Sequence, residues 1–261
     1  MAAPTKSKLS ESVEESQNHK TNNKQAPRGL VTDKEDFGYY FYPEREEKKK
    51  KSYFERALSR DDASNFKCRM NVKSCLEKNP MVRLMVAALS SHGCPVDVNR
   101  HVSCEPCLNK VSGGFDPKAM QVVLCQNNIQ NQDVCCNVLA HELLHAFDFC
   151  RAKVDFENLQ HLACTEIRAA NMNHCSLAAA FAIGEASLFG LKERHQLCVK
   201  NKALQSVLLV RNVSKKEAMV AVDEVFDRCY RDTEPYGRRC FKSMPRARRA
   251  LDEARNYYDF D

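Results

Sequence analysis

One short stretch decides both the fold and the chemistry of this chain, and it reads Val138-Leu139-Ala140-His141-Glu142-Leu143-Leu144-His145-Ala146-Phe147-Asp148. Its apolar residues recur at helical spacing, and Asn131 or Asp133 is a suitable N-cap for a helix that runs to about residue 149. On such a helix, His141 and His145 lie one turn apart on the same face, so both imidazoles can bind one metal ion. The stretch therefore predicts a metal-binding helix.

Glu142 follows the first of these histidines but is rotated by about 100° around the helix axis. This rotation directs its carboxylate toward a water molecule held by the ion rather than toward the ion itself. We therefore expect Glu142 to act as the general base, taking a proton from that water and later passing it to the leaving amine. Two histidine ligands and such a base are the pattern of a peptidase that uses Zn²⁺ as its cofactor.

A third metal ligand is expected from the next predicted helix, which extends from about residue 159 to 171. Glu166 is the preferred candidate, because it lies 21 residues after His145 and small residues around it would let the two helices approach closely. A glutamate on a second helix is the arrangement of gluzincin-type sites. His161 and Asp148 remain alternatives, although Asp148 is better suited to orient a metal-bound histidine through a hydrogen bond.

Two further residues with suitable chemistry follow Glu166 in the sequence. Arg168 or His174 could polarise the carbonyl group of the peptide bond that is cleaved. A surface ion pair for Arg168 and a position at the end of a helix for His174 explain these residues better.

Short β-strands are expected before the metal-binding helix, within residues 95–128. Three valines are followed by Gly113-Gly114, which breaks the chain, and by the apolar run 121–125, which ends at a polar turn. If the strand just before the helix is an edge strand, it could bind the substrate backbone by adding it to the sheet, as many zinc peptidases do.

Helices are expected over about 53–92, 175–189 and 191–228, the last containing an N-cap at Ser214. The predicted fold class is therefore α+β: a mainly helical, zincin-like domain of the gluzincin type with a small β-sheet before the HExxH helix. Residues 1–52 are polar and charged and cannot form a core, which predicts a disordered segment. The metallopeptidase domain is expected to span residues 53–261, with a basic C-terminal end.

Cysteine is unusually abundant in this chain of 261 residues, at positions 68, 75, 94, 104, 107, 125, 135, 136, 150, 164, 175, 198, 229 and 240. This density suggests a disulfide framework and an oxidising compartment. The spacing does not reveal the connectivity, but the adjacent Cys135 and Cys136 point in different directions on a helix and should have different partners. The formal net charge of +6 is mild, and the absence of nucleic-acid-binding motifs predicts no specific nucleic-acid partner.

The N-terminus contains no apolar core of a secretory signal, and its glutamates are unlike a mitochondrial presequence. The longest apolar stretch, residues 177–183, is too short to span a bilayer. A cysteine-rich protein without a cleaved address fits the mitochondrial intermembrane space, where oxidation of cysteines can drive import. The basic residues over 238–249 could contact an anionic membrane surface.

These segments together resemble a known family, the mitochondrial inner-membrane metallopeptidases that mature a membrane subunit of ATP synthase and assist assembly of its membrane sector. The resemblance covers about residues 60–258. It rests on residues 113–116, 123–127, 141–148 and 161–169 and on the basic end around 238–240.

The resemblance implies a domain that is attached peripherally to the inner membrane and faces the intermembrane space, with import coupled to disulfide formation. It also implies a peptide or precursor-protein substrate, an ATP synthase membrane subunit among the partners, and a role in assembly that does not need Glu142. Processing and quality control of precursors are both compatible with it. The alternatives are a non-proteolytic assembly chaperone with a dispensable peptidase site, or a nuclear or cytosolic interaction protein that uses its basic ends.

Overall fold

The computed structural model describes residues 60–107, 111–175, 190–237, 244–258 and 260, all of which belong to one compact unit. The charged segment predicted over 1–52 lies outside these residues. Most of the helix predicted over 175–189 also lies outside them, as does Cys240.

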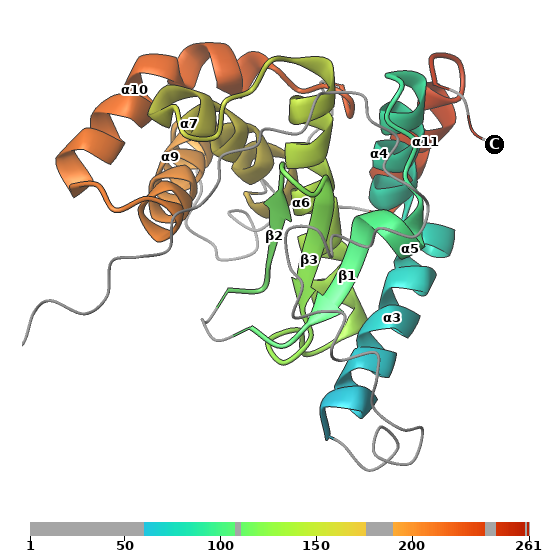
Figure 1. The fold of residues 1–261 in the computed structure, drawn as a ribbon. Coiled ribbons are helices and arrows are strands. Elements are labelled where there is room, and N and C mark those ends of the chain that lie inside the picture. The colour runs from blue at the N-terminus through green and yellow to red at the C-terminus, as the bar shows by residue number, and fades with distance from the viewer. Residues whose placement is uncertain (1–59, 108–110, 176–189, 238–243, 259, 261) are drawn as a thin grey trace, which may run out of the picture. The chain divides into compact units, whose positions relative to one another are not determined.

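The described chain is mainly helical and carries a small sheet before the helix with the two histidines, as the sequence predicts (Figure 1). Residues 98–101 were predicted as strand, and instead form one helical turn that Asp97 caps. No helix in the described ranges is long and apolar enough to cross a membrane. The order of elements is α3 (Arg60–Lys78), α4 (Pro80–Ser91), α5 (Val98–His101), β1 (Val102–Glu105), β2 (Gly113–Asp116), β3 (Gln121–Cys125), α6 (Gln132–Arg151), α7 (Leu159–Ala169), the π-helix η1 (Ala170–His174), α9 (Leu191–Val210), α10 (Lys215–Arg231) and α11 (Met244–Ala254).

Side-chain caps fix where α6, α7 and α10 begin. The Asn131 side chain accepts a hydrogen bond of 3.0 Å from a backbone N–H in the first turn of α6, so Asn131 is the N-cap of this helix. Asn158 caps α7 in the same way. Ser214 caps α10 and forms a reciprocal capping box with Glu217, which confirms the predicted start of that helix.

The sheet has the strand order β1-β3-β2, with β3 parallel to β1 and antiparallel to β2. The strand that directly precedes α6 is therefore the central one, and the idea that it is an edge strand is wrong. The edge strand next to α6 is β2, which pairs with β3 so that Gly113 lies opposite Leu124. A short hairpin thus places an edge strand beside the metal-binding helix.

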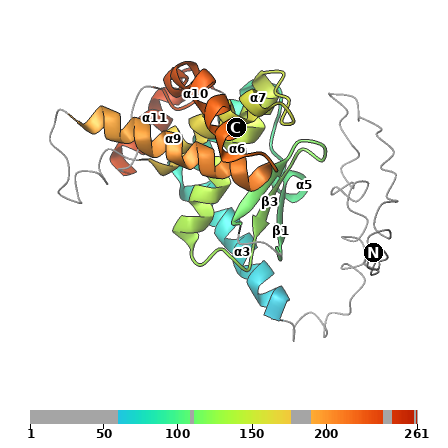
Figure 2. The same cartoon turned by 90° about the vertical axis from the view of Figure 1, so that its left-hand side faces the viewer.

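Two apolar cores lie on either side of the junction between α6 and α7. The first joins α3, α4, α6, α11 and the sheet, and includes the fully buried Leu84, Leu139 and Phe147. The second joins α7, α9 and α10 around residues such as Ile167 and Val207. Figure 1 shows α7, α9 and α10 as one group, and Figure 2 gives the same helices in a view turned by 90°. The two histidines come from a helix of the first core, and Glu166 comes from a helix of the second.

Six disulfides connect the described elements, which confirms the predicted framework: Cys68–Cys104, Cys75–Cys136, Cys94–Cys150, Cys107–Cys125, Cys164–Cys229 and Cys175–Cys198. Cys136 is bridged to Cys75 while its neighbour Cys135 is buried as a free thiol, so the prediction of a separate partner for each holds only for Cys136. Cys135, however, has no disulfide partner at all among the described cysteines.

Candidate metal centre

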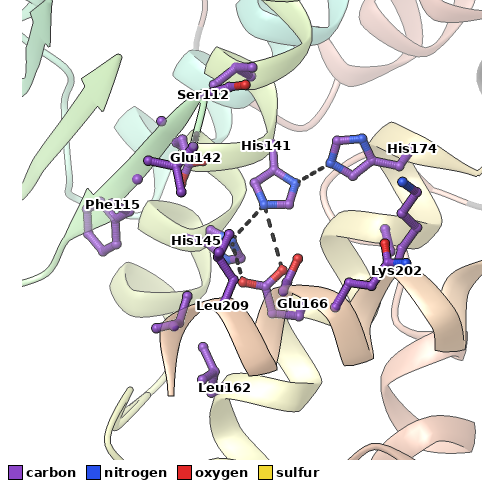
Figure 3. A pocket seen from close by; sticks show the side chains of 18 of the residues that line it. Ser112, Phe115, His141, Glu142, His145, Leu162, Glu166, His174, Lys202 and Leu209 are labelled. Carbon is purple, nitrogen blue, oxygen red and sulfur yellow. Dashed lines mark hydrogen bonds and ion pairs between the residues drawn. The ribbon is translucent and has the colours of Figure 1, made fainter. Parts of the chain in front are cut away.

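The structure brings His141, His145 and Glu166 together at the junction of α6 and α7 (Figure 3). Their potential ligand atoms all lie within 4.8 Å of one another. The two histidine Nε2 atoms are 3.1 Å apart, and the Glu166 oxygens lie 3.7 Å from Nε2 of His141 and 3.5 Å from Nε2 of His145. Three ligand atoms that converge in this way could hold one metal ion.

The hydrogen bonds of Thr165 show that Nε2 of His145, the nitrogen that faces the cluster, is available as a metal ligand. The Thr165 hydroxyl donates a hydrogen bond of 2.8 Å to Oδ2 of Asp148, since a carboxylate that lies between two guanidinium groups only accepts. Oγ1 of Thr165 must then accept the hydrogen bond of 2.8 Å from Nδ1 of His145. Nε2 of His145 therefore carries a lone pair that points into the cluster, which is the form that a metal ion requires.

Glu166 provides a second sign that the cluster fits a cation. Its Oε2 atom is buried and receives no hydrogen bond from the described residues. Buried carboxylate oxygens are rarely left without a partner, because desolvation without compensation is costly. Two imidazoles and one carboxylate form a ligand set typical of catalytic zinc, so the residues present suit that ion.

Burial shifts the pKa of each residue in the cluster and also that of Glu142. Desolvation lowers the pKa of His145 to about 3, helped by Arg168 and His174, and lowers that of His141 well below its usual value. Desolvation raises the pKa of Glu166 to about 7. It also raises the pKa of Glu142 well above its usual value, with a contribution from the Glu166 carboxylate. The histidines are thus neutral near pH 7, as metal ligands must be.

Asp148 does not belong to the cluster of His141, His145 and Glu166, but it supports His145 through a hydrogen bond with Thr165. Its carboxylate accepts hydrogen bonds from Thr165, from Arg168 and, at 3.1 Å, from Nε of Arg151. Asp148 acts on His145 through the hydroxyl of Thr165. The sequence favoured Asp148 as an acceptor that orients a histidine, and in the structure this effect is indirect. The sequence alone gave no sign of Thr165.

Arg168 is not a surface residue and does not face the cavity. Its side chain is 1 % exposed and contacts the carboxylates of Asp148 and Asp232 and the backbone carbonyl of Glu234. Neither predicted role, carbonyl polarisation or a surface ion pair, agrees with this position. Arg168 instead ties α6 and α7 to the segment that follows α10.

His161, the rival third ligand, lies outside the cluster. It is exposed in the first turn of α7, and its Nδ1 accepts a hydrogen bond of 3.1 Å from the backbone of Asp155. His174, by contrast, lies at the end of η1 beside the site, with its Nε2 atom 2.9 Å from Nδ1 of His141.

The cluster lies in a cavity of about 700 Å³ whose walls come from β2, α6, α7, η1 and α9. Glu142 lies on the side next to β2, where a Cβ added to Gly113 would be 3.5 Å from its Cγ (Figure 3). The lining residues are Val111, Ser112, Gly113, Gly114, Phe115, Val138, His141, Glu142, His145, Phe156, Leu162, Glu166, Ala170, His174, Lys202, Gln205, Ser206, Leu209 and Val210. The contribution of α9 was not predicted, because these residues lie far from the motif in the sequence.

An HExxH helix that meets a glutamate from a second helix inside such a cavity defines the class of this protein as a metallopeptidase. The chain belongs to the peptidase M76 family, whose sequence model matches residues 66–237. This match includes every residue of the cluster, together with Glu142.

Several curated relatives are named mitochondrial inner membrane protease ATP23 or its homolog. The chain is 47% identical to the Xenopus laevis protein over 210 residues, which cover 79% of this chain and 87% of that relative. It is 52% identical to the human protein over 178 residues, 67% of this chain and 71% of the relative. It is 34% identical to the Schizosaccharomyces pombe protein over 171 residues, 65% and 90% of the two chains. No solved structure matches the chain.

Proposed function

We propose that this chain is a zinc endopeptidase of the mitochondrial intermembrane space that cleaves or controls the quality of inner-membrane precursor proteins. The observation that carries the proposal is the convergence of His141, His145 and Glu166 in a cavity that Glu142 also lines. In this proposal the first three residues are the zinc ligands, and Glu142 is the catalytic base. The domain is of the zincin type and spans residues 53–261, after a charged segment over 1–52.

A zinc ion in this centre supplies Lewis acidity, which acidifies water and polarises a peptide carbonyl. Glu142 takes up the proton of the attacking water on its carboxylate and later returns it to the leaving amine. Burial raises the pKa of Glu142 above its usual value, which makes its carboxylate a stronger proton acceptor.

Substrate binding is assigned to the edge of β2 and to an apolar wall. In the described sheet, β2 pairs only with β3, so its outer edge can pair with an extended peptide. The side of the cavity around Phe115 and Phe156 is apolar, and Leu162 and Leu209 extend it. We therefore expect extended peptides with an apolar side chain next to the scissile bond as substrates.

The cellular setting of the proposal follows from the relatives, which are named mitochondrial inner membrane proteases. Six disulfides in the described residues agree with an oxidising compartment. Peripheral attachment to the inner membrane, an ATP synthase membrane subunit as partner, and a role in its assembly complete the proposal.

The test combines metal analysis with the variant Glu142→Gln. We expect about one zinc per chain in both proteins, and loss of peptide hydrolysis by a factor of about 10² or more in the variant, because its amide cannot accept the proton. Circular dichroism should show the same fold for both. A folded wild type that binds no zinc, or a variant that hydrolyses peptides at the wild-type rate, would contradict the proposal.

The same variant separates proteolysis from assembly in cells. If assembly of the ATP synthase membrane sector proceeds normally with Glu142→Gln while precursor processing stops, the two activities are independent. If both fail together, the assembly role depends on proteolysis, and the idea of a separate chaperone function is wrong.

A further inference from the structure

His174 contacts the candidate metal centre, although the proposed chemistry gives it no task. It is the last residue of η1, 33 positions after His141. Its Nε2 atom lies 2.9 Å from Nδ1 of His141, while Nε2 of the same imidazole faces His145 and Glu166 (Figure 3). His141 is thus held between the ligand cluster on one side and His174 on the other.

The direction of this hydrogen bond follows from the requirements of a metal ligand. A neutral imidazole that binds an ion through Nε2 carries its proton on Nδ1. His141 must then donate from Nδ1, and Nε2 of His174 must accept. This is the same arrangement as at His145, whose Nδ1 donates to Thr165. Metal-bound histidines generally donate their second ring N–H to such an acceptor, which fixes the ring orientation.

The surroundings of η1 fix the backbone next to His174, whose side chain is itself exposed. The next residue, Cys175, forms a disulfide with Cys198 of α9, which attaches the end of η1 to that helix. The carbonyl of Cys175 also accepts a hydrogen bond of 3.2 Å from Nε2 of the buried His195. Nδ1 of His195 then accepts from the Tyr230 hydroxyl at 2.8 Å. The residue after His174 is therefore fixed to α9 and, through His195, to α10.

We propose that His174 is a positioning residue that accepts the Nδ1 proton of His141 and so holds Nε2 of His141 toward the metal ion. This inference rests on the proposed zinc site and adds a residue outside the HExxH motif. His141 needs such support more than His145 does, because 13 % of its side chain is exposed compared with 6 % for His145. Without an acceptor, its ring can turn and bond to water.

The test measures zinc affinity by competition with a chromophoric chelator in the full chain with its disulfides intact. We expect His174→Ala to bind zinc about tenfold or more weakly, within the range usual for the loss of such an acceptor. His174→Gln should restore most of the affinity, because its side-chain oxygen can accept in place of Nε2. His161→Ala is the matched control, an exposed histidine outside the cluster, and should bind zinc as the wild type does.

Nuclear magnetic resonance gives a second measurement, whose result would not differ between the variants if His174 only supported the fold. In the zinc-loaded wild type and in His174→Gln, the Nδ1 proton of His141 should be protected from exchange with water, and in His174→Ala this protection should be lost. Equal zinc affinity in wild type and His174→Ala would overturn the inference, as would equal losses in the Ala and Gln variants. A wild type that binds no zinc would instead contradict the proposed function itself.

Discussion

At the residue scale, the site depends on hydrogen bonds whose direction is fixed by charged groups behind it. Arg168 and Arg151 flank the Asp148 carboxylate, Thr165 donates to that carboxylate, and His145 donates to Thr165. The order of donors leaves only one tautomer for His145. The ion pairs of Asp148 thus set the tautomer of His145, although they do not contact its ring.

Thr165→Val tests this relay, because valine matches the shape of threonine but cannot transmit a hydrogen bond. We expect zinc affinity to fall by about 10- to 100-fold, since Nδ1 of His145 loses its acceptor. Thr165→Ser, which keeps the hydroxyl, should stay close to the wild type. Competition with a chelator measures both, and unchanged affinity in Thr165→Val would show that the relay does not support the ligand.

At the scale of elements, the close approach of β2 to α6 places the outer edge of β2, the proposed substrate-binding edge, beside Glu142. Gly113 makes this approach possible: an added Cβ would lie 2.7 Å from Cγ1 of Val138 and 2.9 Å from the backbone oxygen of Val123. The valine side chain could shift, but the oxygen belongs to the paired strand and cannot move alone. At Gly114, the next residue, an added Cβ would have no atom within 4 Å among the described residues beyond its two chain neighbours.

Gly113→Ala should therefore push β2 away from α6. Overpacking of this kind destabilises proteins by about 1–3 kcal/mol, and here it should also lower peptidase activity because the strand edge and Glu142 move apart. Gly114→Ala is the matched control and should change neither quantity much. Urea unfolding and peptide hydrolysis measure the two effects. Equal behaviour of the two variants would show that the close contact is unimportant.

The helix α9 contributes an apolar side chain to the cavity without burying it. Leu209 is 68 % exposed and lines the cavity, whereas Leu197 on the same helix is 58 % exposed and does not line it. The substitution Leu209→Asp should lower kcat/KM for peptides with an apolar side chain by about tenfold, as expected for one lost apolar contact. Leu197→Asp should leave it unchanged. A similar effect of both substitutions would show that the loss does not come from a contact between Leu209 and the substrate.

At the scale of the whole molecule, the disulfides stabilise a chain whose apolar residues are divided between two cores. Cys94–Cys150 connects the end of α4 to the end of α6 in the first core, and Cys164–Cys229 connects α7 to α10 in the second. Since the candidate ligands come from both cores, their cluster is complete only when both are folded.

Removal of a disulfide should reduce stability according to the length of the loop that it closes. The double variant Cys94→Ser/Cys150→Ser removes a bridge with a sequence separation of 56, and should lower the free energy of unfolding by about 4 kcal/mol. Cys107→Ser/Cys125→Ser, with a separation of 18, should lower it by about 3 kcal/mol. Urea unfolding under non-reducing conditions checks this order. If removal of Cys107–Cys125 destabilised the protein more than removal of Cys94–Cys150, strain in the folded state or residual structure in the unfolded chain would explain the result better than loop entropy.

The sequence by itself determined the metal helix, narrowed its cap to Asn131 or Asp133, and indicated the type of ligand to expect, because helical periodicity and capping are local properties. The structure decided for Asn131. Spacing on one helix brings His141 and His145 together whatever the rest of the fold does. The preference for Glu166 over His161 also came from the sequence, through the small residues on its helix, and the structure brings Glu166 to the two histidines.

Only the tertiary structure decided which strand forms the sheet edge, which cysteines pair and which distant residues reach the site. The contacts of Thr165, His174 and Leu209 with the centre depend on how α7, η1 and α9 pack against α6, and no local pattern encodes that packing. The burial of Arg168 has the same origin, because two of its partners, Asp232 and Glu234, follow α10, more than sixty residues later in the chain. Long-range packing sets these contacts, since they join segments whose separation in sequence carries no information about their distance in space.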